Sequence, residues 1–168
     1  TNQNNGWWLF EKNQLTLKMI EKIKNKKKLL AIIIRKEYRK KKGVSFFTPN
    51  NLNLQCGYMK HEKNHIIKPH LHLKRLNKIF YTSETIILLK GKLRIDFYDS
   101  KKKYLLSKIL YSSEIITLIS GGHGFKTLSS CEMIEVKQGP YSEKKDKKKF
   151  YETVNNKIKI SGRINWYL

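Results

Sequence analysis

The sequence predicts an all-β protein built from short antiparallel strands, arranged as a sandwich or a barrel. Short apolar segments recur along the chain, and polar residues with glycine, proline or asparagine separate them. Several segments alternate between apolar and polar side chains, which is the pattern of a strand with one buried face. Residues 14–24 fit a short amphipathic helix as well as they fit a strand.

The first expected strands lie between residues 29 and 73. LLAIIIRKEY is followed by Gly43 and by a short apolar segment, VSFF, that ends at a turn formed by Pro49, Asn50 and Asn51. LNLQCGYMKH and HIIKPHLHL follow, with the polar turn EKN between them. These turns favour antiparallel neighbours, because a short turn cannot make the long crossover that parallel strands need.

A hairpin is expected in ETIILLKGKLRIDFYDS, with Lys90 and Gly91 at its turn. Its second arm alternates, so that Leu93, Ile95 and Phe97 share one face while Arg94, Asp96 and Tyr98 share the other. KYLLSKILY, EIITLIS and CEMIEVKQ continue the series of strands. The alternation predicts that one face of each strand packs on a common core.

The length of 168 residues suits one domain with a real core. We expect residues 1–45 to form an N-terminal segment that packs on a central body at 46–141. Residues 142–168 are expected to form a basic linker and a tail, which adds a small hairpin or packs on a partner subunit.

The formal charge of +23 invites a nucleic-acid interpretation. Lysine dominates arginine, however, and the lysine runs are scattered rather than gathered on one periodic face. We therefore expect no nucleic-acid partner, but the charge should attract anionic small molecules.

A cytoplasmic protein without a membrane segment is expected. No apolar run is long enough to span a bilayer, and the start of the sequence does not resemble a signal peptide. Cys56 and Cys131 are expected to be reduced, with a single bridge between them as the alternative.

Two histidines one residue apart indicate a possible metal site. His70 and His72 would point to one face of a strand, because side chains alternate along it. Glu84 opens the hairpin described above, and His123 lies in the glycine-rich segment SGGHGF. Three imidazoles and one carboxylate are a suitable donor set for a divalent metal.

These residues resemble the first conserved motif of the cupin superfamily, G-x5-H-x-H-x3–4-E-x6-G. His70-x-His72 is present, and Glu84-x6-Gly91 keeps the spacing, but eleven residues separate His72 from Glu84. The second motif, G-x5-P-x-G-x2-H-x3-N, survives only through His123. Other residues stand where the two motifs have Gly, Gly, Pro, Gly and Asn: Asn64, Ser112, Leu118, Ser120 and Thr127.

Residues 30–150 also resemble a subgroup of small bacterial cupins, often encoded beside sugar-nucleotide or surface-polysaccharide genes. ISGGHGF, EMIEVKQGPY and the long insertion before Glu84 carry this likeness. The resemblance implies a jelly-roll barrel (a double-stranded β-helix) over 46–141 and a homodimer. It also implies a divalent transition metal (Fe, Mn, Ni, Zn or Co) held by four residues: His70, His72, Glu84 and His123.

Weaker candidates accompany this set. Glu135 and Lys137 share one strand face; a solvent-facing position is the favoured interpretation, and a catalytic position inside the barrel is the alternative. Tyr58 is a cavity residue or a core aromatic. Phe125 is expected to face the interior with His123, whereas three cations of the insertion are placed at the barrel mouth: Lys74, Arg75 and Lys78.

The functional prediction is a metal-binding cupin that acts on or binds a small anionic polar ligand, most plausibly a sugar or sugar nucleotide. Isomerase- or epimerase-like proton transfer is the favoured reaction. A non-enzymatic sugar-binding or accessory module is the first alternative, and an Fe(II) dioxygenase is the second. Whether the protein is an enzyme stays open at this point.

Overall fold

The computed structural model of the chain describes residues 19–40, 42–76, 78–140 and 147–161. The helix or strand expected at 14–24 lies partly outside these ranges, and its described part belongs to a strand. Most of the expected linker at 142–149 and the end of the tail also lie outside them.

Strands make up nearly all of the described secondary structure, which confirms the all-β prediction. The elements, in chain order, are β1 (Ile20–Asn25), β2 (Lys28–Ile34), β3 (Gly43–Phe46), β4 (Gly57–Lys60), β5 (Glu84–Lys90), β6 (Lys92–Tyr98), β7 (Tyr104–Tyr111), β8 (Ile115–Leu118), β9 (Gly122–Thr127), β10 (Glu132–Lys137) and the short 3-10 helix η1 (Asn155–Lys157).

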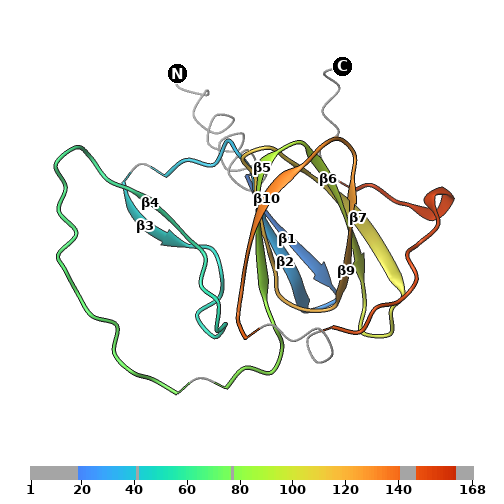
Figure 1. Ribbon diagram of the computed structural model, residues 1–168, viewed down its shortest axis with the longest axis horizontal. Helices are drawn as coiled ribbons and strands as arrows, with labels where there is room; N and C mark the ends of the chain where they lie inside the picture. Colours follow the sequence, from blue (N-terminus) through green and yellow to red (C-terminus); the bar gives the residue numbers. More distant parts are fainter. Residues whose placement is uncertain (1–18, 41, 77, 141–146, 162–168) are drawn as a thin grey trace, which may run out of the picture.

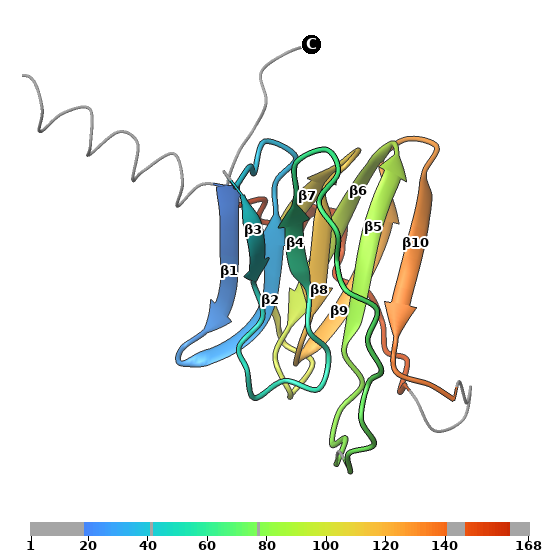
Figure 2. The same cartoon turned by 90° about the vertical axis from the view of Figure 1, so that its left-hand side faces the viewer.

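Two antiparallel sheets face each other (Figure 1). The larger sheet has the order β1-β2-β8-β5-β10, and the smaller has the order β7-β6-β9. Strands β3 and β4 form a separate hairpin on the outer side of the larger sheet (Figure 2). The described chain is therefore a β-sandwich with an attached hairpin.

The sandwich is open where a closed barrel was expected. Strands β9 and β10 end their sheets, and no described strand joins one to the other. The segment HIIKPHLHL, expected to be a strand, has no ladder partner and runs in an extended course away from both sheets. The prediction of a strand there was wrong for the described chain, because alternation shows that a segment suits a sheet but does not place it beside a partner strand.

The core lies between the two sheets. Leu93, Ile95 and Phe97 of β6 are almost completely buried against inward-facing residues of β2, β5 and β8. The predicted alternation is confirmed, because these three share the inner face. Full burial of each such side chain stabilises the fold by about 1.5–3 kcal/mol.

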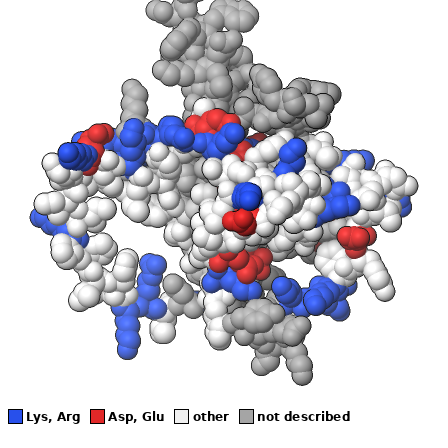
Figure 3. Space-filling model, turned by 45° about the horizontal axis from the view of Figure 1, so that its top comes forward, with Lys and Arg blue, Asp and Glu red and all other residues white. Residues whose placement is uncertain are grey.

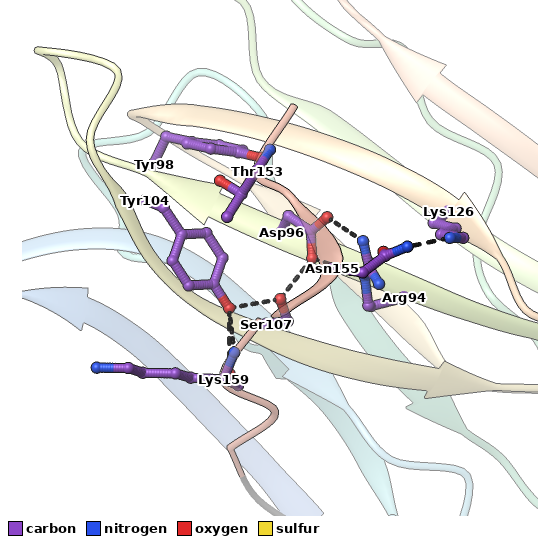
Figure 4. Close-up of polar contacts among 9 residues, drawn as sticks. All are labelled: Arg94, Asp96, Tyr98, Tyr104, Ser107, Lys126, Thr153, Asn155 and Lys159. Atoms are coloured by element: carbon purple, nitrogen blue, oxygen red, sulfur yellow. Dashed lines mark hydrogen bonds and ion pairs between the residues drawn. The ribbon is translucent and has the colours of Figure 1, made fainter. Parts of the chain in front are cut away.

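The opposite face of β6 is buried as well, which the alternation did not predict. Arg94 forms two hydrogen bonds with Asp96, both at 2.9 Å, and Ser107 also donates to this carboxylate. The Tyr104 hydroxyl lies 2.8 Å from the Ser107 hydroxyl and accepts a hydrogen bond from the Lys159 amide (Figure 4). The described part of the C-terminal segment thus packs on the smaller sheet of its own chain. The sequence analysis had expected the tail to add a small hairpin or to pack on a partner subunit.

A buried ionic cluster closes one end of the sandwich. The Arg35 guanidinium lies 2.7 Å from both Glu114 and Glu21, and Lys108 lies 3.0 Å from the second oxygen of Glu21. Arg35 also donates to the Ile109 carbonyl. The cluster joins both sheets near the start of β8, where Glu114 lies. The cavity described next is near the other end of this strand, at Leu118.

Candidate functional site

A cavity of about 640 Å³ opens between the sheets near the C-terminal end of β8. Its walls come from β5, β9 and β10, from the turn that joins β8 to β9, and from the segment at 147–152. The turn requires glycine at Gly121, which has a φ of +78° and lies so close to the Tyr98 carbonyl that a Cβ atom would come within 2.7 Å of it. Backbone geometry therefore shapes this wall.

Glu84 and His123 form the centre of the cavity. His123 Nε2 donates a hydrogen bond to Glu84 Oε2 at 3.0 Å, and both side chains are mostly shielded from solvent. They meet because Glu84 precedes the inward-facing Ile86 on β5, while His123 lies opposite Phe97 in the β6–β9 ladder. Both side chains therefore lie on the inner faces of their sheets, next to the core, and line the cavity.

The hydrogen bond from His123 lowers the pKa of the Glu84 carboxyl below its ordinary value, although burial opposes this effect. The positive charges of Lys137 and Lys147 act in the same direction as His123. Glu84 is therefore an ionised hydrogen-bond acceptor near neutral pH, and it orients the imidazole ring.

Glu135 and Lys137 share one face of β10, for which the sequence analysis gave a solvent-facing and a cavity-facing interpretation. Lys137 lies opposite Glu84 and Glu135 lies opposite Ile86 in the β5–β10 ladder. Glu135 lines the cavity, and its carboxylate is 4.0 Å from Lys137 Nζ. Glu135 is also about as exposed to solvent as its apolar neighbours Ile134 and Val136, so its position agrees with both interpretations. Their catalytic role stays a prediction.

Phe125 lines the cavity with His123, as expected, and the two rings lie 5.4 Å apart. Tyr58 lies elsewhere: it belongs to β4 and packs edge-on against Tyr38 at 5.3 Å. In the described chain, Tyr58 is half-buried on the β3–β4 hairpin and belongs neither to the cavity lining nor to the core cluster.

His70 and His72 do not reach Glu84 and His123 within one described chain. Both are exposed, their rings contact each other edge-on at 5.2 Å, and His70 Nδ1 bonds to the Lys68 carbonyl. Across the described residues, no three His, Cys, Asp or Glu side chains are grouped so that they could hold a metal ion. The four predicted ligands therefore do not fit a metal within a single copy.

Sequence reasoning missed the C-terminal wall of the cavity. Phe150 packs edge-on against Tyr98 with ring centroids 5.0 Å apart, and the Thr153 amide donates to the Tyr98 hydroxyl at 3.2 Å. These contacts bring lysines 147–149 to the cavity rim. No local pattern signals a contact between segments so far apart in the sequence.

Charges of both signs line the cavity. Five lysines and four carboxylates belong to its lining, in the order of the chain: Lys28, Glu84, Asp99, Lys102, Glu135, Lys147, Lys148, Lys149 and Glu152. On the molecular face in Figure 3, the Lys and Arg side chains form separate groups with acidic residues beside several of them. On this face, the described residues do not form the continuous basic stripe that favours nucleic acid.

A scan against protein-family models, a search of curated proteins and a search of solved structures each found no match. No helix in the described ranges has both the length and the apolar character needed to cross a bilayer.

Proposed function

We propose that the cavity binds a small anionic polar ligand, with a sugar or sugar nucleotide as the favoured class, and that Glu84 and His123 transfer a proton on it. The framework of the proposal is a cupin-like jelly roll, which the two facing antiparallel sheets support. The observation that carries the proposal is the hydrogen bond of 3.0 Å between His123 and Glu84 inside a cavity of about 640 Å³.

The lining matches the chemistry of such a ligand. Lysine ammonium groups bind phosphate, whereas carboxylates accept hydrogen bonds from sugar hydroxyls. Tyr98, Phe125 and Phe150 add aromatic surface against which a sugar ring or a base can pack. A cavity of this size falls in the range of ordinary small-molecule sites.

The reaction that fits these groups is an isomerisation or epimerisation next to a carbonyl. His123 would remove the proton from the carbon beside the carbonyl, and the electron pair of that bond would move to the carbonyl oxygen. In an isomerisation, the proton of the adjacent hydroxyl then passes to that oxygen, and His123 returns its proton to the former carbonyl carbon. In an epimerisation, the proton returns to the other face of the same carbon, and neither reaction needs an oxidant. Glu84 holds the imidazole ring in position.

Two measurements test the proposal in sequence. Calorimetric titration with a panel of sugar phosphates and sugar nucleotides should find a saturable ligand, and Lys147→Met, which removes a charge from the cavity lining, should weaken it. Lys126→Met is the matched control, because this exposed lysine lies on β9 outside the cavity lining. The ligand found should then exchange a carbon-bound hydrogen with deuterated solvent in the presence of the wild-type protein.

The results separate the favoured function from its alternatives. Exchange that is lost in His123→Gln supports the proton-transfer role. Binding without exchange contradicts that role and identifies a sugar-binding or accessory module. If no anionic sugar binds to the folded protein, the proposal itself is refuted.

A further inference from the structure

Residues 147–161 form a C-terminal segment that packs on the smaller sheet and reaches the cavity with its first residues. Beyond the cavity lining, the segment is joined to β7. The Ser107 amide donates to the Lys159 carbonyl at 2.8 Å, and the Ser161 amide donates to the Ser107 carbonyl at 3.0 Å. The Lys159 amide also donates to the Tyr104 hydroxyl at 2.8 Å (Figure 4). The sheet therefore fixes this end of the segment.

Phe150 fixes the other end of the segment beside the cavity. Its ring packs edge-on against the nearly buried Tyr98, with ring centroids 5.0 Å apart. Gly122 leaves room for this contact, because a Cβ atom there would come within 3.1 Å of Phe150 Cζ and 3.2 Å of Tyr98 Cβ. The Thr153 amide donates to the Tyr98 hydroxyl at 3.2 Å, so Tyr98 holds this part of the chain at two points.

Four exposed lysines of the cavity lining lie next to Phe150 in sequence or in space. Lysines 147–149 directly precede it in the chain, and Lys102 Nζ lies 5.9 Å from the centre of its ring. We call these four residues, Lys102 and 147–149, the rim lysines. An exposed ammonium group keeps its charge without a desolvation cost, and several together can neutralise a phosphate. Because lysines 147–149 are chain neighbours of Phe150, the position of its ring determines where three of the four charges lie.

We infer that Phe150 is a positioning residue that holds lysines 147–149 at the cavity, where the rim lysines bind the phosphate groups of the ligand. This inference rests on the proposed function for the sugar part of the ligand, and it adds which wall recognises the phosphate. A lysine ammonium group is a compact point charge, so a phosphate or diphosphate with two or more negative charges requires several of them.

The rim lysines lie within electrostatic reach of the proposed proton-transfer pair. The hydrogen bond from His123 lowers the pKa of the Glu84 carboxyl, and the charge of Lys147 lowers it further. Both members of the pair line the same cavity as the rim lysines. A sugar whose phosphate is bound at these lysines would therefore have its ring beside Glu84 and His123.

Inorganic pyrophosphate tests this wall without a sugar. Calorimetric titration of the wild type should show saturable binding that weakens as NaCl is raised, because salt screens exposed charges. Lys148→Met/Lys149→Met should weaken binding by about tenfold. Lys22→Met/Lys24→Met is the matched control, because it removes two exposed charges outside the cavity lining and should bind like the wild type. A parallel titration with inorganic phosphate distinguishes a sugar monophosphate from a sugar nucleotide, whose diphosphate the pyrophosphate resembles.

Phe150→Ala tests the positioning role. The variant keeps all four rim lysines, but pyrophosphate binding should weaken by about tenfold because lysines 147–149 lose their fixed place. Phe150→Leu, which keeps an apolar side chain against Tyr98, should retain most of the affinity. Both variants should keep the far-ultraviolet circular dichroism of the wild type, since Phe150 lies outside the core cluster between the sheets.

Two outcomes would overturn the inference. If the folded wild type binds neither pyrophosphate nor phosphate, the rim lysines are not a phosphate site. If Phe150→Ala binds these anions as well as the wild type does, Phe150 does not position the lysines. Neither outcome decides the proposed function, because the sugar panel and the deuterium exchange test it separately. Conversely, anion binding by a protein that binds no sugar supports the phosphate site and refutes the proposed function.

Discussion

His123 Nε2 and Glu84 Oε2 lie 3.0 Å apart although 39 positions separate them in the chain. The imidazole comes from the smaller sheet and the carboxylate from the larger one, so the pair forms only when both sheets are packed together. The contact between these two residues therefore depends on how the two sheets pack against each other.

We expect Glu84→Gln and His123→Gln to act as a unit. Each substitution should lower the rate of solvent hydrogen exchange into the bound sugar by about 10²-fold or more, since each removes one half of the proton-transfer pair. The double variant should be little worse than either single one, because the two residues share one task. Fully additive losses in exchange measured by NMR would contradict the paired role.

Gly121→Ala should destabilise the fold by about 1–3 kcal/mol in urea denaturation. The positive φ of Gly121 disfavours any side chain, and the added methyl would meet the Tyr98 carbonyl. Gly43→Ala is the matched control, because Gly43 has a φ of +85° but nothing within 4 Å of the new atom. Equal costs at both positions would show that contact with Tyr98 adds nothing.

Glu114→Gln should cost about 3–5 kcal/mol of unfolding free energy. The substitution leaves the buried Arg35 guanidinium without one of its two carboxylate partners. Glu132→Gln provides the comparison: its ion pair with Lys90 is long, at 3.6 Å, and largely exposed, so the change should stay within about 1 kcal/mol. A small effect at Glu114 would mean that the ionic cluster does not hold the sheets together.

Acid should weaken the fold through Glu21. Burial alone would raise the pKa of this carboxyl, but Arg35 and Lys108 outweigh burial and hold its pKa below the ordinary value of 4.5. A lowered folded-state pKa contributes stability above 4.5, and this contribution is lost as the pH falls through the folded-state value. The stability difference between wild type and Glu21→Gln should therefore shrink below pH 4.5 in denaturation series. A difference that stays constant would exclude this linkage.

Strands β5 to β8 and β10 could be predicted because their signal is local, whereas the glycine-rich β9 was not expected. Leu93, Ile95 and Phe97 alternate with polar residues, and the sequence alone places them on one face. The burial of Arg94 and Asp96 could not be predicted, since it depends on a C-terminal segment that returns over the sheet from far along the chain. Contacts between remote segments leave no periodic trace.

The candidate site was predictable in part for the same reason. The resemblance to cupins pointed to Glu84 and His123 together, and the structure brings them into contact. It also pointed to His70 and His72, which are exposed in the extended segment between β4 and β5. Spacing can suggest that residues share a site, but it does not show that the fold brings them together. The metal itself remains a prediction.

One measurement tests the central claim most directly: the imidazole nitrogen resonances of His123 during titration with sugar phosphates and sugar nucleotides. A ligand bound in the cavity should shift the His123 resonances in a saturable way, while those of His61, which stacks on His65 at 4.2 Å, should stay unchanged. If every member of the panel leaves His123 unperturbed in the folded protein, the cavity is not a site for anionic sugars.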